Sequence, residues 1–135
     1  MAGTDLNIFS VAGRAMSAQQ VRMNTAASNL ANASAVSSKE SDAYRPIKAV
    51  FATQMDKATG LATVNVSSVV RADATPVRQH DPGNPLADEN GDVWAAPVDE
   101  SAEMVEMLDS SRQYQNLVET LSTAKQLMLD TIRMK

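Results

Sequence analysis

An uninterrupted helical pattern over residues 99–135 limits the possible folds of this chain more than any other feature, because no glycine or proline interrupts it. Asp99 can cap its start, and Arg133 and Lys135 complement the carbonyl end. At about 1.5 Å per residue the helix would be on the order of 50 Å long, which exceeds the diameter of a globule built from so short a chain. Its apolar and small residues recur at helical spacing and form one seam: Met104, Met107, Leu108, Ser111, Tyr114, Val118, Leu121, Met128 and Ile132. Such a seam requires a partner of similar length.

A second helix is predicted over residues 5–32, with Asp5 or Asn7 as its cap and with Asn29 and Asn32 weakening its end. Large side chains fall at seven-residue intervals, and small or polar ones follow three residues after each: Phe9, Met16, Met23 and Leu30, then Ala12, Gln19, Ala26 and Ala33. This helix could simply pack on its own domain. Pairing with the C-terminal helix and with other chains is favoured, because both ends of the chain carry a seam.

The middle of the chain, residues 33–98, offers little to cover these seams. Aromatic residues make up 4% of the chain and many of its hydrophobic residues are alanines, so the large side chains that supply most burial energy are scarce. Residues 33–42 are rich in serine and are expected to form a mobile loop or a contact between subunits that orders on assembly. A compact, independently stable core is therefore not expected.

From Tyr44 onward the hydrophobic period changes to two, which predicts a β-hairpin with strands over 44–55 and 62–70 and a turn at 56–60. A lone hairpin is marginal in water, so it needs a third strand or a helix packed against it, and short strands near Val77 and Val93-Trp94 are candidates for the strand. Turn-forming residues fill 81–85 and 88–92. The predicted class is α+β, with a helical domain from residues 1–32 and 99–135, paired in the manner of a coiled coil, and a β-rich module at 33–98.

Charge and composition exclude several classes of partner. The net charge of −4 and the isoelectric point near 4.9 disfavour nucleic acid and acidic lipid. No apolar run approaches the roughly 20 residues of a membrane span, and the N-terminus lacks the pattern of a cleaved secretory signal. Without cysteine there are no disulfides or thiolate metal sites. These features favour the cytoplasm or an export route that uses no such signal.

The polar residues form no catalytic motif. His80 and Asp81 are neighbours, but adjacency supplies neither an orienting partner nor a nucleophile, so His80 is expected to be exposed. Asp88, Asn90 and Asp92 imitate the start of a calcium loop, yet the later positions do not fit and a turn explains them. Arg14 and Arg22 are interpreted as a solvated face. We expect no catalysis, cofactor, metal or small-molecule substrate.

Several motifs resemble those of the bacterial flagellar axial proteins. The N-terminal motif has Asn7-Ile8-Phe9, Ala12-Gly13, Ala15 to Gln19, Arg22-Met23-Asn24 and a Ser28-Asn29-Leu30-Ala31-Asn32 core. Within that group, residues 81–88 and the run from Glu103 through Tyr114 to Leu129 resemble the basal-body rod proteins of the proximal rod. The likeness runs nearly end to end, with departures in loops at Asp92, at Ala96-Pro97-Val98 and after Asn32.

The resemblance implies a structural subunit of the rod, the drive shaft that crosses the periplasm and transmits torque from motor to hook. Its partners would be other rod proteins, copies of itself and the flagellar type III export apparatus. The subunit-packing seam would comprise Phe9, Met16, Met23, Leu30, Met104, Leu108, Tyr114, Val118, Leu121, Met128 and Ile132. The alternatives are another axial protein of the distal rod or hook junction, a cytoplasmic coiled-coil adaptor and, with little support, a small hydrolase using His80.

Overall fold

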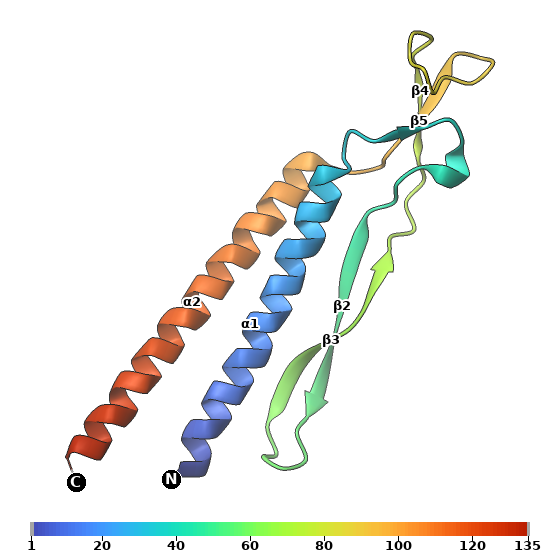
Figure 1. Cartoon of the computed structure of the whole chain (residues 1–135). Coiled ribbons are helices and arrows are strands. Elements are labelled where there is room, and N and C mark those ends of the chain that lie inside the picture. The colour runs from blue at the N-terminus through green and yellow to red at the C-terminus, as the bar shows by residue number, and fades with distance from the viewer. Residues whose placement is uncertain (1, 135) are drawn as a thin grey trace.

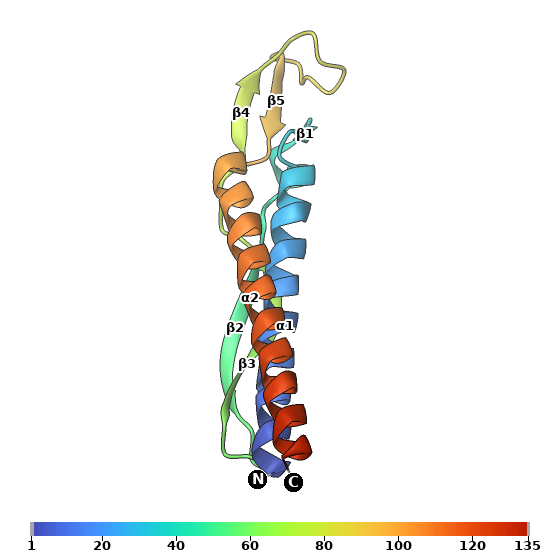
Figure 2. The same ribbon diagram turned by 90° about the vertical axis from the view of Figure 1, so that its left-hand side faces the viewer.

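The computed structural model describes the backbone of residues 2–134 and the side chains of residues 8–134. The molecule is elongated, with two long helices side by side and a β-hairpin running along one of them (Figures 1 and 2). The elements in order are α1 (Ala2–Ala31), β1 (Val36–Ser37), a 3₁₀ turn (Glu40–Asp42), β2 (Ile47–Met55), β3 (Ala62–Arg71), β4 (Val77–His80), β5 (Asp92–Ala95) and α2 (Glu100–Arg133). The predicted α+β class is confirmed in this arrangement of helices and small antiparallel sheets.

The C-terminal helix begins where the sequence predicts, because the Asp99 side chain accepts a hydrogen bond from the Ala102 amide at 3.2 Å. Lys135, predicted to complement the carbonyl end, lies outside the described residues. The expected start of the first helix was wrong: α1 already begins at Ala2, so neither Asp5 nor Asn7 is its cap. The chain ends N and C lie at the same end of the molecule, so α1 and α2 run antiparallel (Figure 1).

The predicted hairpin is confirmed, with β2 and β3 paired from Ile47↔Arg71 to Met55↔Ala62 and a bulge between Val50 and Phe51. The turn closes with the amide of Asp56 donating to the Leu61 carbonyl at 2.9 Å, and Gly60 adopts the positive φ that this turn requires. Of the two supports expected for this hairpin, a third strand is not the one observed. One face of the ribbon packs on α1 instead, which provides the support that an isolated hairpin lacks.

The two short strands expected near Val77 and Val93 do form, but they make a sheet of their own at the far end of the molecule (Figure 2). Its strand order is β1-β5-β4, and Val36 pairs with Ala95. The serine-rich segment 33–42 is therefore not a featureless loop, because it supplies the edge strand β1 and a 3₁₀ turn. We call this three-stranded sheet with its turns the head.

The buried core is thin, as the composition predicts. The buried apolar residues among those described are four alanines, two prolines and one valine: Ala12, Ala18, Ala26, Ala96, Pro46, Pro76 and Val93. Large apolar side chains are instead exposed along α2 and the hairpin. Over the part of the chain that the structure describes, neither helix is long and apolar enough to cross a membrane.

Candidate assembly surfaces

The junction between α1 and α2 is formed by an inner stripe of α2. Ser110 at its centre is fully buried, with its hydroxyl donating to the Glu106 carbonyl at 2.7 Å. The small side chain permits close approach of α1. The other members are half-buried and recur at alternating steps of four and three residues: Met107, Tyr114, Leu117, Leu121, Ala124 and Met128. Because α1 is the principal neighbour of α2, this stripe is covered by α1 within one chain.

The residues expected to form the packing seam divide into two groups on α2. Half-buried members on the inner stripe are Tyr114, Leu121 and Met128. The exposed members lie on the neighbouring face of α2. They are Met104, Leu108, Val118 and Ile132, with exposed fractions of 55%, 69%, 44% and 63%. Their spacing defines an outer stripe that no element of the described chain covers.

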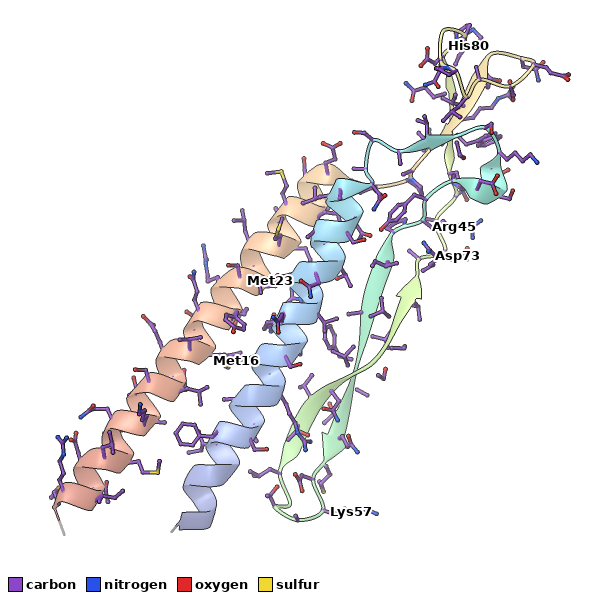
Figure 3. All side chains as sticks on the ribbon, viewed as in Figure 1. Met16, Met23, Arg45, Lys57, Asp73 and His80 are labelled. Atoms are coloured by element: carbon purple, nitrogen blue, oxygen red, sulfur yellow. The ribbon has the colours of Figure 1, made fainter. Side chains whose placement is uncertain are left out.

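On α1 the four large heptad residues are all half-buried: Phe9, Met16, Met23 and Leu30. Met16 and Met23 are labelled on α1 in Figure 3. Their small heptad companions Ala12 and Ala26 are buried. Sequence reasoning missed Leu117 and Ala124 in the inner stripe of α2. A strict alternation of four and three steps from Glu103 onward would have separated the inner stripe from the outer one.

Arg22 connects the two helices, which corrects the expectation of a solvated arginine face. Its guanidinium donates to Glu106 at 2.7 Å and to Asp109 at 3.0 Å on α2, and to Gln19 at 2.8 Å on α1. The hydrogen bond with the Glu106 carboxylate raises the pKa of Arg22 above its ordinary value. Gln19 thus orients the arginine that fixes the position of α1 against α2.

Arg14 is likewise not a free surface charge, because it attaches α1 to the hairpin. Its guanidinium donates to the Thr63 hydroxyl at 2.9 Å and lies 3.6 Å from the Asp56 carboxylate. Thr63 is itself buried and donates to the Gln54 carbonyl. The hairpin is thereby held to α1 at its lower end.

Asn29 holds the other end of the hairpin, a role that was not expected from the sequence. It is 1% exposed, donates to the Ile47 carbonyl at 3.0 Å, and accepts from the Ile47 amide at 2.9 Å and from the Tyr44 hydroxyl at 2.8 Å. The amide of one side chain therefore imitates a strand partner for the first residue of β2. These hydrogen bonds explain why an asparagine stands at the second position of the Ser28-Asn29-Leu30-Ala31-Asn32 motif.

His80 is exposed, as expected, with a side chain 67% accessible. Its partner is Asp92 and not the adjacent Asp81: His80 Nδ1 lies 2.9 Å from the Asp92 carboxylate, which also accepts from Arg78. The turn interpretation of Asp88 is confirmed, because its carboxylate accepts the amides of Asn90 and Asp92 at 2.8 and 2.9 Å. Among residues 8–134 no group of acidic and histidine side chains has the arrangement of a metal site.

We expect the head to be destabilised in acid, because the Asp92 carboxylate holds it together. Hydrogen bonds with His80 first and Arg78 second lower its pKa below the ordinary value of 3.8. A lowered pKa in the folded chain contributes stability that is present above pH 3.8 and is lost as the pH falls through the lowered value. The fluorescence of Trp94, the single tryptophan, is expected to report loosening of the head below pH 3.8. Asp92→Asn should have a weaker head at neutral pH and little further change in acid; an unaltered acid transition would contradict this prediction.

Two family models match the terminal regions of the chain, and relatives match most of its length. The family model described as "Flagella basal body rod protein" matches residues 9–37, and the model described as "Flagellar basal body rod FlgEFG protein C-terminal" matches residues 90–134. The flagellar basal-body rod protein FlgC of Salmonella typhimurium LT2 is 47% identical over 94% of this chain and 95% of its own length. Those of Escherichia coli O6:H1 and Agrobacterium fabrum are 46% and 30% identical, over 94% and 90% of this chain and 95% and 88% of their own lengths.

Proposed function

The chain belongs to the flagellar basal-body rod protein family, and from this premise we propose how it serves as a structural subunit of the proximal rod. Subunits of the rod assemble with other rod components in the basal body. We infer that this chain does so by packing its terminal helices against those of neighbours, including further copies of itself. Torque passes along the shaft because helices packed together resist twisting collectively.

The observation that carries this proposal is the outer stripe of α2. Met104, Leu108 and Ile132 are each more than half exposed, whereas the buried apolar residues among those described are alanines and prolines apart from Val93. Burial contributes roughly 1.5–3 kcal/mol for each large apolar side chain, so neighbours that cover this stripe would add burial energy that the isolated chain does not obtain. An assembly of this kind completes the fold of each subunit.

The expected packing seam is retained in this proposal with two roles. The inner stripe and the α1 heptads pair within one chain, in the manner of a coiled coil, and the outer stripe meets neighbours. Residues 1–32 and 99–135 would then form the axial helical domain, and residues 33–98 the β-rich module beside it. Contacts that repeat without rotational closure generate a helical shaft.

The remaining parts of the proposal concern chemistry and route. The protein acts by packing and carries out no reaction, and it needs no cofactor. It reaches the periplasm-spanning rod through the flagellar type III export apparatus. The distal-rod alternative has less support, because relatives of nearly the same length bear the FlgC name, and a cytoplasmic adaptor would leave the family resemblance unexplained.

Leu108→Asp tests the proposal without disturbing contacts inside the chain, since Leu108 is 69% exposed. We expect the variant to be exported, to melt like the parent as a purified chain, and to be absent from isolated basal bodies, so that cells are non-motile. Leu86→Asp is the matched control, with the same change at an exposed leucine of the head. Motile cells with Leu108→Asp in their rods would contradict the proposal.

A further inference from the structure

The upper part of the hairpin turns a partly apolar face away from the helices. Ile47, Ala49 and Phe51 line a hollow beneath it, together with Arg22 of α1 and Ala102 of α2. Because side chains alternate along a strand, the intervening residues of β2 and their partners on β3 lie on the opposite face. We call these four exposed residues, of which the first also borders the hollow, the hairpin face: Lys48, Val50, Ser68 and Val70.

An apolar ridge lies on the first turns of α2. Met104, Val105 and Leu108 are each more than half exposed and form one continuous surface, at spacings of one, three and four residues. The inner stripe around Ser110 packs on α1, so the ridge is directed away from α1. Figure 1 shows the first turns of α2 and the upper part of the hairpin at the same level, with α1 between them. Ridge and hairpin face therefore cannot meet within one chain.

The two surfaces lie in regions of opposite charge. Residues 99–109, which include the ridge, contain five carboxylates and no lysine or arginine, and Arg22 of α1 pairs with two of the five. Residues 44–73, which include the hairpin, contain four basic and two acidic residues. One of these acids, Asp56, already lies 3.6 Å from Arg14. The other, Asp73, stands with Arg45 at the upper end of the hairpin (Figure 3), where two further basic residues lie on the strands: Lys48 and Arg71.

We propose that the ridge of one copy packs on the hairpin face of a second copy that stands beside it at the same level. This inference rests on the proposed function and specifies the partner and the two surfaces in contact. No element of the described chain covers either surface, and their opposite charges favour this pairing. The contact is heterologous, so each copy can bind one neighbour through its ridge and another through its hairpin face.

Disulfide cross-linking tests this contact directly, because the chain contains no cysteine. Val70→Cys and Leu108→Cys chains would be produced together in motile cells, and isolated basal bodies oxidised mildly. We expect a dimer linked through positions 70 and 108, identified by mass spectrometry, and no dimer when either variant is produced alone. Val50→Cys with Met104→Cys is a second pair, for use if a member of the first fails to assemble. In the control pair Val64→Cys, at an exposed valine near the hairpin turn, replaces Val70→Cys and should not link to position 108.

Charge substitutions test the choice of partner. Lys48→Glu in the Val70→Cys chain should lower the yield of the 70–108 dimer severalfold, because it places a carboxylate against the acidic turns of α2. Glu100→Lys in the Leu108→Cys chain should restore part of that yield. Lys57→Glu, at the hairpin turn, is the matched control and should leave the yield unchanged. Equal yields with Lys48→Glu and Lys57→Glu would contradict the proposed pairing.

A dimer in basal bodies containing Leu108→Cys alone would mean that ridges face each other, and would overturn the inference. Basal bodies that contain the cysteine variants but yield neither a 70–108 nor a 50–104 dimer would overturn it as well, while leaving the proposed function intact. Immunoblotting of the same basal bodies separates the two failures. Absence of the wild-type chain from isolated basal bodies would contradict the proposed function itself.

Discussion

Asn29→Ala is expected to lower the free energy of unfolding by about 3 kcal/mol, because each buried polar group left without a partner costs about 1–3 kcal/mol. The substitution removes three hydrogen bonds, to the Ile47 amide, the Ile47 carbonyl and the Tyr44 hydroxyl. The hairpin would lose its hydrogen-bonded attachment at the upper end of α1 and keep its packing on α1 and the Arg14 contact at the other end. Such a loss is large for a chain with so thin a core.

Urea unfolding followed by circular dichroism measures this change, and hydrogen exchange of the β2 amides locates it. Asn24→Ala is the matched control, since Asn24 is exposed on the same helix. We expect its unfolding free energy to stay within about 0.5 kcal/mol of the parent. If both variants unfold alike, Asn29 does not hold the hairpin.

Arg22→Glu is expected to separate α1 from α2 over their facing turns. The substitution replaces the cation between Glu106 and Asp109 by a third carboxylate. These side chains are between 21% and 49% exposed, so solvent screens their repulsion. We therefore expect a loss of about 2 kcal/mol in unfolding free energy, smaller than a fully buried pair would give.

A charge swap makes the prediction specific. Arg22→Glu combined with Glu106→Arg restores opposite charges across the helix junction and should recover about half of the lost stability in thermal melts. Arg112→Glu is the control, because Arg112 is exposed on α2. Equal melting temperatures for Arg22→Glu and the parent would contradict the assigned role of Arg22.

The sequence predicted the elements of this fold that depend on local patterns. The heptads of α1, the Asp99 cap, the alternation in β2 and β3 and the turn after Met55 are each encoded within a few residues, so they were found with nearly correct bounds. The start of α1 was misplaced, because caps at Asp5 and Asn7 were inferred from residue type alone. The partners of the short strands were not predicted, because strand pairing depends on contacts between residues distant in the sequence.

The assembly surfaces could be predicted only in outline. The apolar spacing identified α2 as a helix with an uncovered side, but it merged the inner and outer stripes. Leu108 lies on the outer stripe and Leu121 on the inner one, and which stripe is covered depends on the position of α1. The contacts of Arg22 and Asn29 were missed for a related reason: their partners are on α2 and on the segment from Tyr44 to Ile47, and no spacing rule links them.

The central claim is that α2 is incompletely packed until neighbouring subunits cover it. Hydrogen exchange of its amides over residues 118–133, measured by mass spectrometry in the dilute purified chain and in isolated basal bodies, tests this claim most directly. We predict fast exchange in the free chain, where most side chains of this segment are exposed, and strong protection in the basal body. Slow exchange in the dilute chain, together with a cooperative unfolding transition of α2, would contradict the account.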